Sequence, residues 1–322
     1  AWLIRLAAIV LAMLVCAGLI VLITGYNPIE VYVSMFKGSF GSTRKVWITM
    51  QKTALLLCIS LAVTPAFKMK FWNLGAEGQV LMGACATAGC MLAWGNKMPI
   101  GLLIPVMLIA AVAAGTIWAL IPAVCRAKWG TNESLFTLMM NYVAMQIVSY
   151  CITFWENPIG SNTVGIINSA TSGGWLPSLF GQKYLLNILV VALITILMYI
   201  YLKYSKHGYE IAVVGESQNT ARYIGINVKK VIVRTVALSG ALCGLAGLLL
   251  VAGTDHTIST NTVGGQGLPP ADFTVSTIKR IISSSPDVGF IMAIRLIFSL
   301  PKPLGATVRR TLSPGTMRVC RM

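Results

Sequence analysis

The sequence predicts an all-α fold, a polytopic bundle of transmembrane helices, from its composition and the distribution of its charges. Of its 322 residues, 56% are hydrophobic and 11% are charged, whereas soluble domains carry about 25% charged residues. The formal net charge is +16, but Lys and Arg fall in short clusters between apolar runs rather than on one folded face. We therefore exclude a soluble domain and a nucleic-acid partner, and place the chain in the lipid bilayer.

Seven apolar segments are the predicted spanning helices. A bilayer core of about 30 Å needs about 20 apolar residues in a helix, because every backbone polar group there has to be bonded within the segment. The segments cover residues 3–23, 52–67, 75–94, 99–124, 135–154, 184–202 and 231–252. The second is short and the third is rich in Gly and Ala, so their ends are the least defined.

The Lys and Arg residues predict the orientation, since they are enriched in cytoplasmic loops. With the N-terminus in the cytoplasm, ten of them lie in inside loops and six in outside loops. Segment 155–182, which has no Lys or Arg, then lies outside. The polar interval 203–234, which holds six Lys and Arg, lies in the cytoplasm.

The two ends of the chain differ from its middle. It begins with Ala1 rather than Met, and we expect that an N-terminal piece is missing. Residues 1–266 form the predicted membrane domain. Residues 267–322 form a basic tail, interrupted by Pro, in which no spanning helix is predicted. We interpret this tail as frameshifted or disordered, and resequencing the locus tests the hypothesis that the frame is lost near Gly267.

The sequence contains no pattern typical of catalysis or metal binding. Most cysteines lie inside apolar segments, where Cys serves as a small hydrophobic residue, and no C-x-x-C or Cys/His cluster is present. Paired carboxylates and Ser/His arrangements are also absent from the apolar segments. We predict no disulfide, no metal, no cofactor and no catalytic residue.

Residues 71–79, with the sequence FWNLGAEGQ, are the first polar signature. Asn73, Glu77 and Gln79 lie where the third segment begins, and such residues near hydrocarbon usually face a cavity or the interior of a bundle. The alternative is local, since Asn73 can cap the helix and Glu77 interacts favourably with its N-terminus. Both interpretations stay open.

The second signature is TNESLFTLMMNYVA, residues 131–144. Thr131 or Asn132 can cap the helix, and Glu133 interacts favourably with its N-terminus. The helical spacing places Ser134, Thr137, Asn141 and Ser149 on one face. Such a polar face either lines a polar path or bonds to a neighbouring helix. For Asn141 we favour the path.

The third signature is the polar interval 203–234. Its residues 217–224, SQNTARYI, predict about two helical turns that end at Gly225. Ala221 and Ile224 are expected to form a small apolar face with Arg222 beside it, and so short a helix needs packing to be stable. Further on, Gly240, Gly244 and Gly247 form a small-residue face that predicts close helix packing.

These three signatures, in this order, resemble the permease subunits of bacterial ATP-binding cassette (ABC) importers, in the branch for nucleosides and simple sugars that works with a basic membrane lipoprotein. FWNLGAEGQ resembles the family motif F-N-x-G-x-E-G-Q, and NESLFTLMMNYVA resembles N-E-x-x-x-T-L-M-x-N-Y-x-A. GYEIAVVGESQNTARYIGINV resembles the cytoplasmic loop whose short helix docks into the ATPase. The resemblance covers about residues 1–267.

The resemblance implies a multi-pass subunit of the bacterial plasma (inner) membrane. The sequence contains no G-x-x-x-x-G-K-[ST] phosphate loop, so a separate ABC ATPase is implied, together with a second permease subunit and an extracytoplasmic substrate-binding lipoprotein. The implied ATPase-coupling residues are Gly215, Glu216, Ala221, Arg222, Ile224 and Gly225. The candidate translocation path consists of Asn73, Glu77, Gln79, Ser134, Thr137 and Asn141.

Three functions remain as alternatives. The leading one is a permease for nucleosides, and the second is a permease for a simple sugar such as ribose or a galactoside. The third, from a different class, is an ion-coupled secondary transporter. That class needs several acidic or His residues at mid-membrane, and only Glu77 comes near this position.

Overall fold

The computed structural model describes residues 2–25, 27–161, 163–179, 181–260 and 262. The expectations for the tail 267–322 lie outside these residues. In chain order, the described elements are α1 (Trp2–Thr24), α2 (Pro28–Phe40), α3 (Thr43–Lys68), α4 (Ala76–Trp94), α5 (Ile100–Trp129), α6 (Glu133–Trp155), α7 (Leu185–Tyr204), α8 (Lys206–Glu216), α9 (Gln218–Tyr223), α10 (Val228–Leu250) and the π-helix η1 (Val251–Asp255).

The predicted all-α membrane bundle is confirmed. Six helical stretches are long and apolar enough to cross a membrane among the described residues: α1, α3, α5, α6, α7 and α10 with η1. The third predicted segment forms α4 at its expected place, but this helix is not among the six. Because most of α4 is buried by other helices, it can consist of small residues and does not need a strongly apolar surface.

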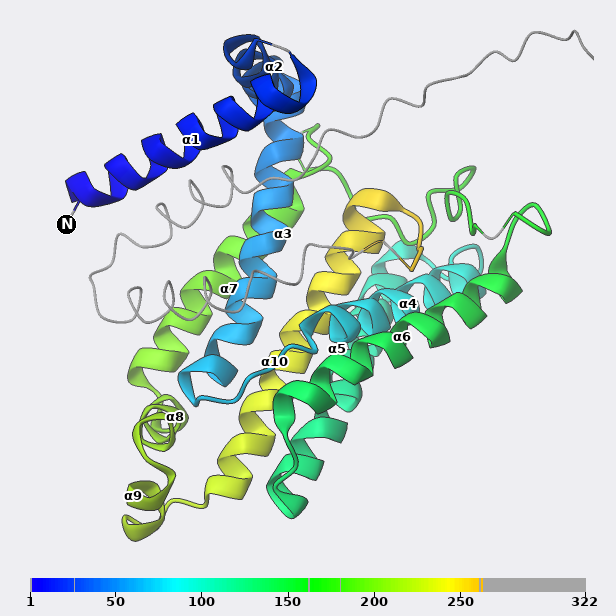
Figure 1. Ribbon diagram of the computed structural model, residues 1–322. Helices are drawn as coiled ribbons and strands as arrows, with labels where there is room; N and C mark the ends of the chain where they lie inside the picture. Colours follow the sequence, from blue (N-terminus) through cyan, green and yellow to red (C-terminus); the bar gives the residue numbers. More distant parts are fainter. Residues whose placement is uncertain (1, 26, 162, 180, 261, 263–322) are drawn as a thin grey trace, which may run out of the picture.

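The centre of the fold is formed by α10, which packs against α3, α4 and α5 (Figure 1). Its small-residue face allows the close approach that the sequence predicts. A Cβ atom added to Gly83 of α4 would lie 2.6 Å from the Cα of Gly244, and one added to Gly115 of α5 would lie 2.8 Å from it. The packing role expected for Gly240 and Gly244 is therefore confirmed.

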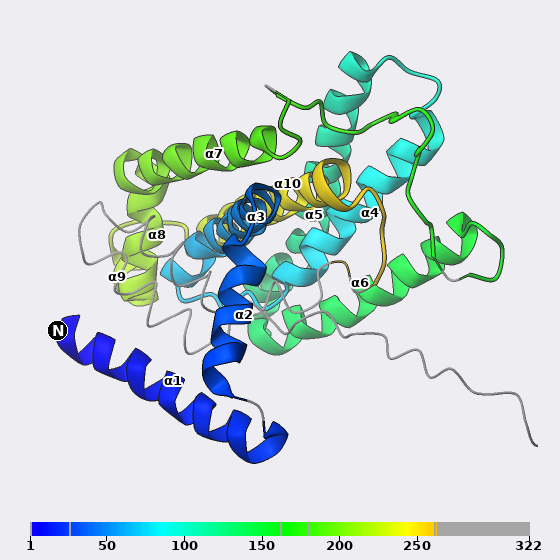
Figure 2. The ribbon, with the colours of Figure 1, turned by 90° about the horizontal axis from the view of Figure 1, so that it is seen from above.

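The first two helices lie at the periphery of the fold. Figures 1 and 2 show α1 apart from the main bundle and joined to it through α2. The side chains of α1 whose exposure the structure describes, at 6–8 and 10–23, are mostly exposed, as expected for a helix that faces lipid. In contrast, α2 occupies residues that we expected to be a loop. Its local signals are clear: Asn27 Oδ1 accepts a hydrogen bond from Ile29 N at 3.0 Å, and Pro28 is the first helical residue.

The second predicted span is shorter than the helix that contains it. We expected residues 52–67, whereas α3 begins at Thr43 after the N-cap Ser42. An apolar run marks only the part of a helix that lies in hydrocarbon, and the backbone hydrogen bonds continue into the polar end. The last predicted span, 231–252, similarly begins earlier, at Val228, and continues into η1.

The polar interval 203–234 forms two short helices at one end of the bundle (Figure 1). The sequence predicts the second, α9, but not the first, α8. Ser205 begins α8, where its Oγ accepts a hydrogen bond from Gly208 N at 3.0 Å. Packing then stabilises both helices, because Ile211, Val214 and Ala221 are buried in a cluster with residues of α3, α5 and α10.

Candidate functional site

A group of buried polar side chains joins α4, α6 and α10. Asn73, in the turn before α4, is 2% exposed. Its Oδ1 accepts hydrogen bonds from Gly75 N and Gln79 Nε2, each at 3.2 Å. Its Nδ2 donates to Ser239 Oγ of α10 at 3.2 Å. Asn73 and Gln79 therefore satisfy each other's carboxamides and connect the start of α4 to the central helix.

From α6, Asn141 and Thr137 bind the backbone at the start of α4. Asn141 Oδ1 accepts a hydrogen bond from Gly78 N at 2.9 Å, and its Nδ2 donates to Leu74 O at 2.9 Å. Thr137 Oγ1 accepts from Leu74 N at 3.2 Å. The N–H groups in the first turn of a helix have no intrahelical partner. The side chains of α6 supply a partner to the buried Gly78 N and bind both backbone groups of the half-buried Leu74 just before α4.

We call this set the polar joint; its members are Asn73, Gln79, Thr137, Asn141 and Ser239. Four of the six candidate path residues belong to it. The other two lie beside it: Ser134 is in the first turn of α6, and Glu77 is half-buried in the first turn of α4. Within the described part of the chain, no hydrogen bond or ion pair holds the Glu77 carboxylate. That these six residues line a path stays a prediction.

The start of α6 is fixed by the corner that joins it to α5. Asn132 is the N-cap residue, and its Oδ1 accepts hydrogen bonds from Ser134 N and Leu135 N at 3.1 and 3.3 Å. Arg126 Nε lies 3.2 Å from Glu133 Oε2, in an ion pair across the corner. These contacts set the position from which Thr137 and Asn141 reach α4.

We call residues 206–225 the coupling segment, after the ATPase-coupling role that the resemblance implies for residues 215–225, which stays a prediction. The helix predicted over residues 217–224 corresponds to α9, whereas Gly215 and Glu216 end α8. Ser217 Oγ accepts a hydrogen bond from Thr220 N at 3.2 Å, and this cap separates α9 from α8. Gly225 follows α9 with a φ of +84°, which agrees with its predicted role as the stop.

The coupling segment has one face on the bundle and one face exposed. The Cβ that Gly215 lacks would collide with the backbone oxygen of Lys68 at the end of α3. Ala221 is fully buried, whereas Ile224 is 59% exposed. The apolar face expected for these two residues is therefore not formed, because Ile224 lies beyond the end of α9. On the exposed side are Glu216, Arg222, Tyr223 and Ile224.

The charge of the coupling segment varies little near neutral pH. Its only histidine, His207, is partly buried, and Tyr201 Oη lies 3.0 Å from His207 Nδ1. Burial lowers the pKa of His207, and the Glu210 carboxylate opposes this shift by a smaller amount. The lowered pKa favours the neutral ring, and the exposed charged side chains of the segment are Lys206, Glu216 and Arg222.

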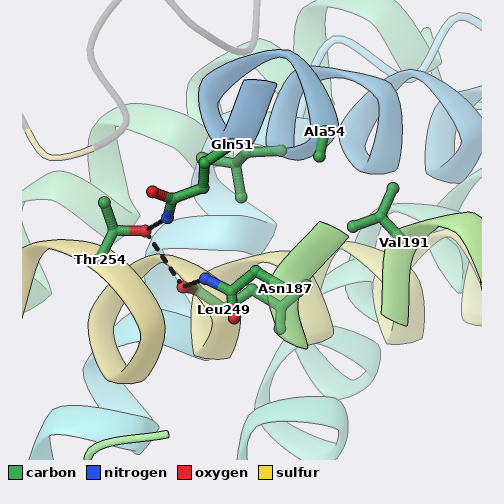
Figure 3. Close-up of a pocket in the computed structure, with 7 residues that line it drawn as sticks. Gln51, Ala54, Asn187, Val191, Leu249 and Thr254 are labelled. Carbon is green, nitrogen blue, oxygen red and sulfur yellow. Dashed lines mark hydrogen bonds between the residues drawn. The ribbon is translucent and has the colours of Figure 1, made fainter. Parts of the chain in front are cut away.

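A second buried polar group was not predicted from the sequence. Gln51 of α3, Asn187 of α7 and Thr254 of η1 meet at the end of the bundle away from the coupling segment (Figures 1 and 3). One signal was present: a carboxamide within or beside an apolar span is costly and marks a functional position. Their contact was not predicted, because the three residues are far apart in the sequence.

The fold is thus a helical membrane bundle with a buried polar joint and an exposed two-helix segment. The sequence profile of the family described as branched-chain amino acid transport system / permease component matches residues 47–275. The chain belongs to this permease family, which confirms the resemblance seen in the three signatures.

Individual relatives support the same assignment. The chain is 33% identical over 254 residues to the guanosine ABC transporter permease protein NupP of Bacillus subtilis, covering 78% of this chain and 72% of the relative. It is 31% identical to the nucleoside ABC transporter permease protein NupB of Lactococcus lactis, covering 77% and 70%. It is 29% identical to the glucose ABC transporter permease protein TsgB13 of Haloferax volcanii, covering 80% and 70%. No solved structure matches the chain significantly.

Proposed function

We propose that this chain is the permease subunit of an ABC importer for nucleosides, driven by a separate ATPase that binds the coupling segment. The observation that carries the proposal is the two-sided character of this segment. Its buried residues Ile211, Val214 and Ala221 pack on α3 and α10, while Arg222 and Tyr223 are exposed. A force applied to the exposed face is therefore transmitted to the bundle, where alternating access requires two discrete arrangements.

The choice of nucleosides rests on the relatives. The guanosine and nucleoside permeases share more identity with the chain than the glucose permease does. The glucose permease supports the second candidate, a simple-sugar permease. An ion-coupled secondary transporter receives no support from these relatives, each of which is named as an ABC permease.

The proposal includes partners and an orientation. The ATPase lies on the cytoplasmic side with the coupling segment, which places the N-terminus in the cytoplasm. An extracytoplasmic lipoprotein delivers the substrate to the other side, where residues 155–182 connect α6 to α7. A second permease subunit completes the membrane part of the complex.

Uptake of labelled substrates by the complete transporter tests the substrate class. We expect cells that express it to accumulate guanosine or another nucleoside, and cells that lack this chain to lose the uptake. The partner lipoprotein, tested against nucleosides and sugars, is expected to bind a nucleoside. Accumulation of ribose or glucose without any nucleoside would instead establish the simple-sugar permease.

Replacing Asn141 with Leu tests the role of the polar joint. The change leaves Gly78 N and Leu74 O without partners, at about 1–3 kcal/mol each, while Thr137 and Asn73 keep their bonds. We expect uptake to fall by about tenfold or more, because Asn141 belongs to the candidate path, and the amount of assembled transporter to fall by less. The measurement compares initial uptake rates with complex recovered by affinity purification.

The matched control is Ser149→Ala. The spacing predicts Ser149 on the face of Asn141, but this prediction is wrong, because Asn141 is buried and Ser149 is exposed in the structure. The control variant should leave both uptake and assembly at the wild-type level. If Asn141→Leu prevents the complex from forming, the residue serves packing alone and the path proposal for Asn141 is wrong.

A further inference from the structure

Three polar side chains from distant parts of the sequence meet in the bundle. Gln51 Nε2 donates a hydrogen bond to Thr254 Oγ1, and Asn187 Nδ2 lies 3.5 Å from the Leu249 carbonyl oxygen (Figure 3). Gln51 and Asn187 are each 3% exposed, whereas Thr254 is half-buried. The group therefore lies just beneath the surface at one end of the bundle. We call Gln51, Asn187 and Thr254 the polar pocket.

Two acceptors in the polar pocket have no partner in the part of the chain that the structure describes. Gln51 Oε1 and Asn187 Oδ1 are buried and form no hydrogen bond among the described residues. A buried polar atom without a partner costs about 1–3 kcal/mol, so such atoms are rare in folded proteins and require a reason. Both atoms are amide carbonyl oxygens, which accept hydrogen bonds from donors such as hydroxyl groups.

The pocket is nearly closed in this structure. Its cavity of about 10 Å³ is lined by the three polar residues with Ala54, Leu55, Val191 and Leu249. This is roughly the space that one water molecule needs, so a small-molecule substrate enters only when the helices separate. Such a separation is what an alternating-access transporter undergoes.

The backbone beside the pocket is irregular. Thr254 belongs to the π-helix η1, a form that is rare and frequently lies at functional sites. His256, directly after this helix, has a left-handed conformation with φ of +50°, and its ring stacks on Trp175 at a centroid distance of 3.9 Å. Ile167 N donates to His256 O at 2.8 Å. The connection between α6 and α7 therefore packs against η1 and His256, at the end of the bundle opposite the coupling segment.

We infer that the polar pocket binds the hydroxyl groups of the transported substrate when the bundle opens, with Gln51 Oε1 and Asn187 Oδ1 as acceptors. The substrate class is a ligand that carries a sugar ring, either a nucleoside or a free sugar. This inference rests on the proposed function. It locates a contact for the substrate at the end of the bundle opposite the coupling segment.

The test compares each variant with the wild type for two pairs of substrates, and one member of each pair lacks one or two hydroxyl groups of the sugar. Asn187→Leu and Gln51→Met remove the acceptors with little change in volume. Uptake of inosine and of 2′,3′-dideoxyinosine is measured in the complete transporter, and ribose and 2-deoxyribose form the second arm. Because the partner lipoprotein is the same in every assay, its own selectivity cancels in the ratio of wild type to variant.

We expect each variant to lose about tenfold in kcat/KM for inosine or for ribose, as one lost hydrogen bond implies. The loss for the deoxygenated substrate of the same arm should stay below about twofold. A selective loss in the inosine arm identifies a nucleoside as the source of the hydroxyl groups, and one in the ribose arm identifies a free sugar. The control is Thr195→Val on α7. The Thr195 hydroxyl donates to Val191 O of its own helix at 2.7 Å, so this variant should leave kcat/KM unchanged for both members of each pair.

Equal losses for the hydroxylated and deoxygenated substrates would overturn the inference, because they indicate a pocket that holds an internal water molecule only. Failure of both variants to reach the membrane would overturn it as well, since the carboxamides would then serve the fold. A wild-type transporter that takes up neither nucleosides nor sugars would instead contradict the proposed function itself.

Discussion

Replacing Arg222 with Glu, or Glu216 with Lys, should lower substrate uptake by about tenfold or more while ATP hydrolysis continues. Both side chains are exposed on the coupling segment, so neither change disturbs the buried contacts of Gly215 and Ala221. A reversed charge that faces a complementary partner costs several kcal/mol. The expected defect is therefore in the contact with the ATPase rather than in the fold.

Purified complex in proteoliposomes allows both quantities to be measured on one preparation, as substrate accumulated and phosphate released. The matched control is Lys128→Glu, which reverses an exposed charge at the end of α5, outside the coupling segment. It should keep the wild-type ratio of uptake to hydrolysis. Unchanged uptake by both Arg222→Glu and Glu216→Lys would remove the coupling segment from the mechanism.

Replacing Gly244 with Ala should destabilise the bundle by about 1–3 kcal/mol, the usual cost of overpacking. The added Cβ would collide with the Ala111 carbonyl oxygen and lie 3.2 Å from the Cα of Val112. These are backbone atoms of α5, so no side-chain rotation relieves the contact. The measurement is the midpoint of thermal aggregation of detergent-solubilised protein, followed by size-exclusion chromatography.

The control for this prediction is Gly18→Ala in the middle of α1, where an added Cβ meets no atom within 4 Å. Alanine favours a helix over glycine by about 1 kcal/mol, so this variant should be as stable as the wild type or slightly more stable. Equal midpoints for the Gly244 and Gly18 variants would show that the close approach of α10 and α5 is not needed for stability.

The predictions from sequence succeeded where local chemistry decides the structure. Spanning helices follow from the length of apolar runs, and the short helix α9 follows from Ser217, the residues after it and Gly225. They failed where the local signals were not combined. Asn27, Pro28 and Glu30 together mark the start of α2. This helix was not predicted, because its residues do not form an apolar run long enough to span the membrane.

The candidate site was predicted in part. The sequence identified Asn73, Gln79, Thr137 and Asn141 as unusual for a membrane segment, and the structure brings all four into the polar joint. It did not reveal what they bind, because the partners of Asn141 are backbone atoms at Leu74 and Gly78, which carry no mark in the sequence. For the same reason, the contact of Gly215 with the end of α3 could not be foreseen.

By itself, therefore, the sequence determined the class of protein, the positions of most helices and the place of the short helix α9, since these depend on composition and on residues close together in the chain. Only the tertiary structure decided that Gln51, Asn187 and Thr254 form one pocket, and that two acceptors there lack partners among the described residues. Helices α3, α7 and α10 are far apart in sequence. Whether their polar groups satisfy one another depends on how the helices pack, which no local pattern records.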